Sequence, residues 1–175
     1  MTDPVLLPVG FGLGIWTPAD EPEYCIRLGG EVIAVSPAEY DLWWQSRFHP
    51  TAGELLDQAR ADGVSSPGTA VEGLFAAGLL AEPDTAFAAA HRLVTTGLGG
   101  GYDEQSADGL LGIGDATGRP LVRVDPATYL FWALSDGTVS LADATQAAHL
   151  DPGAVWPALA GLLEVGAGYL DRMVP

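Results

Sequence analysis

The residues best suited to covalent catalysis are one cysteine and three histidines, and they lie far apart in the sequence. They are Cys25, His49, His91 and His149. Nucleophilic catalysis needs a nucleophile, a base and a group that orients the base, and none of the four belongs to a recognised motif. Cys25 falls in a predicted strand, so we interpret it as a small core or near-core residue. The prediction is a protein that is not an enzyme and uses no cofactor.

Two glycine-rich runs raise the possibility of phosphate binding, because glycines let a ligand approach the backbone closely. They are Gly10–Gly14 and Gly97–Gly101, and each follows a candidate strand. A phosphate loop opens a helix and usually carries a lysine. No helix signal follows either run, and the chain has no lysine. We therefore predict that these glycines form bends or bulges at strand ends.

A third candidate site is an acidic cluster formed by Asp103, Glu104 and Asp108. Clustered carboxylates are ligands that calcium prefers, but this spacing does not match an EF-hand loop. We interpret the segment as a solvated loop without a metal. The surrounding region 99–118 is predicted to be disordered.

The elements that would position these residues are organised as a repeat. The segment Val35–Trp43 recurs as Val124–Trp132, 89 residues later, and Gly73–Gly78 recurs as Gly161–Gly166, 88 residues later. A nearly constant offset over most of the chain indicates two copies of one unit. The predicted domains are 1–83 and 92–175, and residues 84–91 link them.

Each copy begins with strand patterns. In the first copy these are 5–11, 24–28 and 31–35, with a hairpin turn at Gly29–Gly30. In the second copy they are 92–98, 110–113 and 120–124.

Three helices follow in each copy. Capping residues mark their starts, and these are Ser36, Thr51, Ser66, Asp125, Ser140 and Asp151. Tyr40, Trp43 and Trp44 share one stripe of the first helix, as do Tyr129, Trp132 and Ala133 in the second copy, so we predict that both stripes are core. Pro157 is expected to kink the last helix or to restrict it to a short run.

This order of elements predicts an α+β fold with two tandem winged-helix-like repeats that form a pseudo-dimer. Each copy resembles the PqqD-like peptide-recognition domains of ribosomal peptide (RiPP) biosynthesis. The resemblance rests on the hairpin 24–35, the helix starts Ser36-Pro37 and Thr51-x-x-Glu54, and the run Leu74–Leu80. In that family a leader peptide adds a strand beside the third strand and packs against the third helix.

The resemblance implies an apolar groove in each copy. In the first copy it would involve Val32, Ile33, Val35, Val71, Leu74 and Phe75. In the second copy it would involve Leu121, Val122, Val124, Val155, Leu159 and Leu162. The same residues would also serve as a hydrophobic core.

The charge of the chain excludes several partners. It has 23 acidic residues against seven arginines, which gives a formal net charge of −16. Phosphate backbones and anionic membranes repel such a chain. The predicted third helices, which would face DNA in a winged helix, contain no basic residue. We expect no nucleic acid and no membrane partner. The missing signal peptide and the single cysteine indicate a cytoplasmic protein.

The sequence thus predicts a non-catalytic module that binds a protein or peptide as an adaptor, a scaffold or a recogniser of leader peptides. Its acidic surface would favour a basic partner. The alternative is a transcription regulator or DNA mimic that acts through protein contacts. The sequence leaves open the partner, the pathway, the oligomeric state and whether one or both repeats bind. It also leaves open whether the repeats share a continuous sheet or swap strands.

Overall fold

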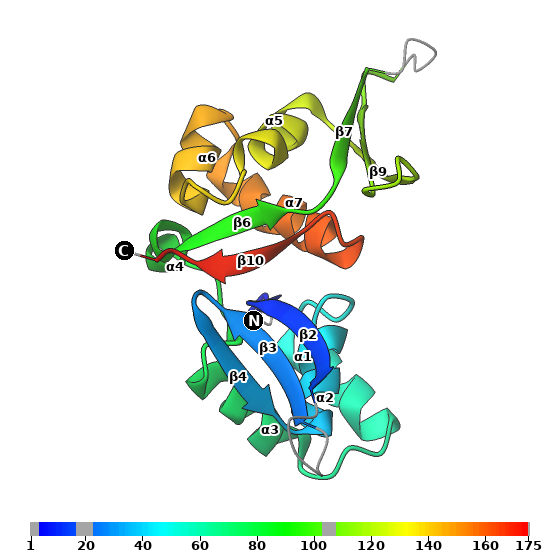
Figure 1. Cartoon of the computed structure of the whole chain (residues 1–175), viewed down its shortest axis with the longest axis vertical. Helices are drawn as coiled ribbons and strands as arrows, with labels where there is room; N and C mark the ends of the chain where they lie inside the picture. The colour runs from blue at the N-terminus through cyan, green and yellow to red at the C-terminus, as the bar shows by residue number, and fades with distance from the viewer. Residues whose placement is uncertain (1–3, 17–22, 103–107, 175) are drawn as a thin grey trace. The chain divides into compact units, whose positions relative to one another are not determined.

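The chain has an α+β fold in which helices accompany several small antiparallel sheets, as predicted (Figure 1). The computed structural model describes residues 4–16, 23–102 and 108–174. Internal contacts divide the chain into two compact units. The first comprises Met1–Asp84 with Val174–Pro175, and the second comprises Thr85–Met173.

The first unit is built from five strands and three helices among its described residues. In chain order they are β1 (Leu7–Pro8), β2 (Phe11–Trp16), β3 (Glu23–Leu28), β4 (Glu31–Val35), α1 (Pro37–Gln45), α2 (Ala52–Ala61), α3 (Pro67–Ala76) and β5 (Leu80–Ala81). β2, β3 and β4 form an antiparallel sheet in that order, and β1 pairs with β5. The helices cover one face of the three-stranded sheet (Figure 1).

The second unit repeats this arrangement after one additional helix. Its elements are α4 (Thr85–Ala90), β6 (His91–Thr95), β7 (Leu98–Tyr102), β8 (Leu111–Gly114), β9 (Pro120–Val124), α5 (Pro126–Leu134), α6 (Leu141–Ala147), α7 (Pro152–Glu164) and β10 (Gly168–Arg172). β7, β8 and β9 form a sheet, and β6 pairs with β10. The helix α4 lies within the predicted linker 84–91.

The first strand of each copy differs from its prediction. In place of the predicted strand over 5–11, the structure has the short β1 followed by the longer β2, which contains Gly12 and Gly14. Gly10 separates them with φ of 101°, and an added Cβ there would lie 2.8 Å from the carbonyl oxygen of Arg27. The glycines do form a bulge, between Gly12 and Gly14, but it lies inside the strand. The prediction of a bend at a strand end is therefore confirmed for Gly10, and it is wrong for Gly12 and Gly14, which lie inside β2.

Gly12 shows why the sequence needs glycine inside β2. A Cβ at this position would lie 2.6 Å from the Tyr40 hydroxyl and 3.0 Å from the Trp43 ring. Gly99 of β7 lies against Tyr129 and Trp132 in the same way. In the first unit α1 therefore packs directly on the backbone of the sheet, and in the second unit α5 does the same.

The predicted aromatic stripe is only partly core. Trp43 is fully buried and donates its indole N–H to the Val9 carbonyl at 2.9 Å, whereas Trp44 is 42% exposed. Leu42 takes the second buried position, because α1 packs against α3 as well as against the sheet. In the second unit Trp132 and Phe131 are buried while Ala133 is exposed. The core prediction is therefore wrong for Trp44 and Ala133.

Pro157 does not restrict the last helix to a short run, because α7 continues through this residue over 13 residues. Because proline has no N–H, residue 157 cannot make the helix hydrogen bond to the carbonyl of Gly153. Val155, Leu159 and Leu162 are all buried along the same helix. Their burial outweighs the loss of a single bond.

Asp125 offers a test of how a cap stabilises the second unit. Its carboxylate accepts bonds from the backbone N–H groups of Ala127 and Thr128 and from the Thr128 hydroxyl at 2.6 Å. The bond from the Thr128 side chain is the main reason that the pKa of Asp125 lies below its usual value. At neutral pH, Asp125→Ala should lower the free energy of unfolding by about 1 kcal/mol, measured by denaturant titration.

The contribution of this carboxylate should also depend on pH. Because the folded pKa is lowered, the stabilisation is present above the usual carboxyl pKa of about 4 and is lost as the pH falls through the folded pKa. The difference between wild type and Asp125→Ala should therefore shrink in acid. The same change at Glu72, an exposed acid in the middle of α3, should show no such trend. A difference that persists unchanged in acid would contradict this account.

Candidate functional site

The candidate site lies on the face of the β2-β3-β4 sheet that points away from α1. On the helix face, the Tyr24 ring lies 5.0 Å from the Tyr40 ring of α1. Side chains alternate along a strand, so Cys25 and Arg27 point to the opposite, outer face. The strand register pairs Cys25 with Ala34 and Arg27 with Val32, which places these β4 residues on the outer face as well.

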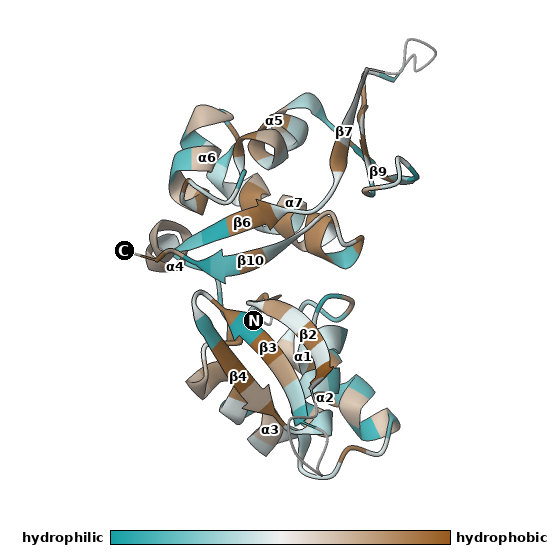
Figure 2. Cartoon of the chain, in the orientation of Figure 1, coloured by the Kyte–Doolittle hydropathy of each residue, from teal (hydrophilic) through white to brown (hydrophobic). Residues whose placement is uncertain are grey.

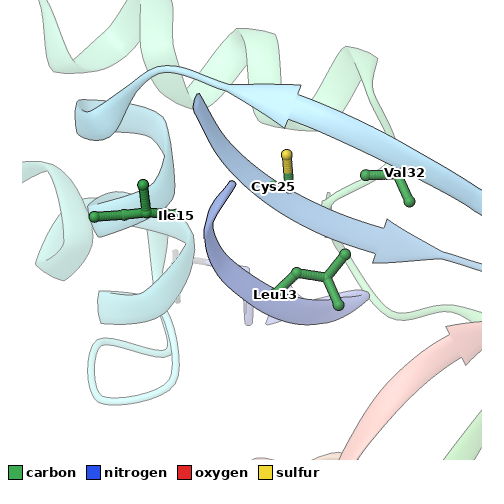
Figure 3. Close-up of a pocket in the computed structure, with 4 residues that line it drawn as sticks. All are labelled: Leu13, Ile15, Cys25 and Val32. Carbon is green, nitrogen blue, oxygen red and sulfur yellow. The ribbon is translucent and has the colours of Figure 1, made fainter. Parts of the chain in front are cut away.

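The outer face contains an apolar pocket of about 340 Å³ (Figure 3). The described residues that line it are Leu13 and Ile15 from β2, Cys25 from β3 and Val32 from β4. Leu13, Ile15 and Val32 are 46%, 58% and 55% exposed, whereas Cys25 is buried. The volume lies within the range of small-ligand pockets, and it is large enough for an apolar side chain of a partner.

The glycine-rich sequence of β2 shapes this pocket. The register of β2 against β3 shifts between Gly12 and Gly14, which leaves Leu13 as the extra residue of a bulge. Bulges bend a strand and redirect side chains. Gly14 has φ of 78°, which a residue with a side chain rarely adopts. The bulge therefore presents Leu13 beside Ile15 at the pocket.

The edge of the sheet is open at β4. The sheet order is β2-β3-β4, and within the described part of the chain no strand pairs with the outer side of β4. Glu31 is the one charged residue of β4, and the four residues that follow it, Val32–Val35, include neither a proline nor a charge that would protect the edge. Figure 2 shows hydrophobic residues along β4. An unprotected edge of this kind is a template for another strand.

The charged groups near the outer face are of both signs. Glu23 at the start of β3 is exposed on this face, whereas Glu31 at the start of β4 is also exposed but pairs with Leu28 and so points to the helix face. The one arginine of β3, Arg27, is half-buried and lies 5.7 Å from the centre of the Phe11 ring. With a net charge of −16 on the chain, this surface attracts a basic partner more readily than an acidic one.

The structure divides the residues predicted to line the first groove. Val32 is exposed, while Ile33, Val35 and Phe75 are half-buried. Val71 and Leu74 of α3 are buried, so in this conformation they pack the core. Sequence reasoning missed Leu13 and Ile15, because it placed Leu13 in a glycine bend and ended the predicted strand at residue 11. The apolar residues between the glycines were the signal that could have revealed them.

The second unit has a related pocket with a different lining. Its volume is about 310 Å³, and its described lining is Leu98, Gly99, Gly100, Gly112, Ile113, Gly114, Gly118 and Pro120. Glycines thus replace Leu13 and Cys25 of the first unit. Of the predicted residues, Leu121, Val122 and Val124 are half-buried, whereas Val155, Leu159 and Leu162 are buried. The two copies therefore differ in the side chains that line this pocket.

The residues considered for catalysis or metal binding do not gather. Within residues 4–16, 23–102 and 108–174, no three His, Cys, Asp or Glu side chains form a metal site. Asp103 and Glu104 lie outside the described residues, and Asp108 pairs with Arg123 at 2.7 Å. His91 stacks on Phe87 at 4.0 Å, and burial lowers the pKa of its imidazole. Cys25 is buried, as predicted for a core residue.

Comparisons with protein-family models, curated proteins and solved structures gave no match to this chain. Among the described helices, none combines the length and the apolar character needed to cross a bilayer. Any functional conclusion therefore depends on the geometry of the outer face.

Proposed function

We propose that this chain is a non-catalytic peptide-binding protein and that its first unit captures an extended segment of its partner beside β4. The observation that carries this proposal is the open edge of β4 next to the apolar pocket formed by Leu13, Ile15, Cys25 and Val32. In each unit a three-stranded sheet is followed by three helices, and this order supports the PqqD-like, winged-helix-like interpretation. In that interpretation, too, the third strand receives the peptide.

Strand addition divides the work between backbone and side chains. Main-chain hydrogen bonds along the edge provide affinity, and side chains that alternate between the two faces provide specificity. β4 is five residues long, so a bound segment of similar length would pair with the backbone hydrogen-bonding groups along its open edge. Apolar side chains of the bound segment would extend the outer face next to Val32. Basic residues would be favoured at its ends, near Glu31 and the acidic surface.

Selection of peptides provides a direct test. A display library of random peptides should yield binders that alternate apolar residues and carry basic ones. Val32→Asp should weaken these binders by at least about tenfold, because it places an unpaired charge in the apolar contact. Fluorescence anisotropy with labelled peptides measures the change. Phe48→Asp is the control, since Phe48 is 45% exposed in the same unit but does not line the pocket.

A second form of each peptide tests the backbone contact. N-methylation of alternate amides removes donors without changing the side chains, so the face that pairs with β4 should lose binding when methylated. The other set of amides should tolerate methylation. The proposal would be overturned if neither Val32→Asp nor N-methylation changed the affinity of the selected peptides. It would also be overturned if the library yielded no binders.

A further inference from the structure

The first unit has a second pocket, on the helix face of its sheet, that is lined mainly by aromatic residues. Its volume is about 560 Å³, and its described lining is Tyr24 of β3 with Pro37, Tyr40, Asp41 and Trp44 of α1. Tyr24 and Tyr40 are half-buried, while Trp44 and Asp41 are exposed. One carboxylate thus stands among three aromatic rings.

The spacing on α1 explains how these side chains meet. Tyr40 and Asp41 lie three and four residues after Pro37, and Trp44 lies four and three residues after them, so the four residues share one side of the helix. The side of α1 that carries Glu39 faces α3. Glu39 Oε1 lies 2.9 Å from the point that a Cβ atom would occupy if Gly73 of α3 had a side chain. The aromatic side of α1 is therefore left beside Tyr24, where the ring centres of Tyr24 and Tyr40 are 5.0 Å apart.

The second copy shows that the fold does not require this set of residues. The strand register pairs Tyr24 with Val35 and Leu111 with Val124, so Leu111 occupies the place of Tyr24. On α5, Leu130 and Ala133 occupy the places of Asp41 and Trp44, while Pro126 and Tyr129 are kept. The residues that differ are the carboxylate and two of the three rings. A purely structural role would predict that the second copy needs them too.

The chemistry of the lining specifies a cation. Aromatic faces attract ammonium and guanidinium groups through the ring quadrupole, and rings that surround a site bind alkylated ammonium groups in particular. The Trp44 ring already attracts one cation, since Arg47 Cζ lies 4.3 Å from its centre. Arg47 is not among the described residues that line the pocket. Asp41 adds a formal negative charge on an already acidic chain.

The geometry points to this pocket as a binding site for an alkylammonium group, held by Tyr24, Tyr40 and Trp44 and neutralised by Asp41. This site is separate from the edge of β4 and does not depend on strand addition there. Two sources carry the same group: a lysine side chain of a peptide, methylated or not, and a free quaternary ammonium compound. The neutral side chain of equal shape should bind poorly, because it gains the apolar contact without the electrostatic attraction.

The test uses the full chain and four probes. They are choline, its neutral isostere 3,3-dimethylbutan-1-ol, and the Nα-acetyl methylamides of lysine and trimethyllysine. Each is titrated to about 10 mM, which detects millimolar affinity, and the indole N–H resonance of Trp44 reports binding. The trimethylated probes should bind at least about fivefold more tightly than the neutral isostere. Comparison of choline with the trimethyllysine probe separates the two sources.

Matched variants link the binding to the residues. Trp44→Leu should weaken the trimethylated probes by about tenfold, followed through the tyrosine resonances. Asp41→Asn should weaken them more than Glu72→Gln, which removes the same charge from an exposed position on α3. Circular dichroism confirms that each variant is folded. Equal binding of the neutral isostere, equal effects of Asp41→Asn and Glu72→Gln, or no binding of any probe would overturn the assignment.

Discussion

Trp43→Ala is expected to lower the free energy of unfolding of the first unit by about 3–5 kcal/mol. The Trp43 side chain is 0% exposed beneath the backbone of β2, so its removal leaves a cavity that the sheet and α1 cannot fill. The change also removes the indole donor to the Val9 carbonyl, which then lacks that buried partner. Denaturant titration followed by circular dichroism measures the loss.

The neighbouring tryptophan provides the matched control. Trp44→Ala should change the free energy of unfolding by less than about 1 kcal/mol, because this ring is 42% exposed and contributes little to the core. Any larger loss should come from its contact with Arg47 at 4.3 Å. Similar losses for Trp43→Ala and Trp44→Ala would show that the stripe is core throughout, as the sequence pattern alone suggested, and would contradict the structure.

Most features that depend on short stretches of sequence were predictable, although the side chain of Ser66 makes no cap hydrogen bond at the start of α3. Ser36 receives the N–H of Glu39 while the Glu39 carboxylate receives the N–H of Ser36, which is the capping box expected from the sequence. Thr51 and Glu54 form the N-terminal cap of α2. Gly78 and Gly166 end the third helices with φ of 70° and 73°. Such contacts involve residues within about one turn, so a single sequence contains both partners.

Features that depend on distant packing were not predictable. The spacing of Tyr40, Trp43 and Trp44 marks one stripe, but only the position of α3 decides that Leu42 is buried and Trp44 is exposed. The glycines of β2 suggested a bend, and only the Tyr40 and Trp43 rings explain why Gly12 lies inside a strand. The spacing of apolar residues indicates that a helix has a buried side. Tertiary contacts decide which residues at the border of that side are buried.

The candidate site illustrates the same division. The sequence placed Val32 on a third strand and named it as a binding residue, and the structure puts it at the open edge of the sheet. Leu13 and Cys25 are 12 residues apart in the chain and meet only through the bulged register of β2 and β3. The pocket on the helix face combines Tyr24 with α1, a contact between a strand and a helix that no local pattern encodes.

Asp171→Ala is the second change with a large expected effect, and it acts on the second unit. Asp171 is almost fully buried, and its Oδ2 lies 3.1 Å from Nη2 of Arg92. Arg92 also donates to the Gly137 carbonyl at 2.8 Å. Strands β6 and β10 bring the two residues together across 79 positions of sequence. Removing the carboxylate leaves a partly buried guanidinium without its counter-ion, which should cost about 3 kcal/mol.

Two comparisons separate the ion pair from a simple loss of packing. The double variant Arg92→Leu/Asp171→Leu should recover most of the stability, because replacing both members of a buried pair with apolar groups removes the unpaired charge. Asp57→Ala breaks the exposed pair of Asp57 with Arg60 and should have little effect, since water screens such pairs. Denaturant titration of the three variants measures the free energies of unfolding. If the double variant is as unstable as Asp171→Ala, the loss in the free energy of unfolding comes from altered packing at the Asp171 site. In that case the unpaired charge of Arg92 does not cause the loss.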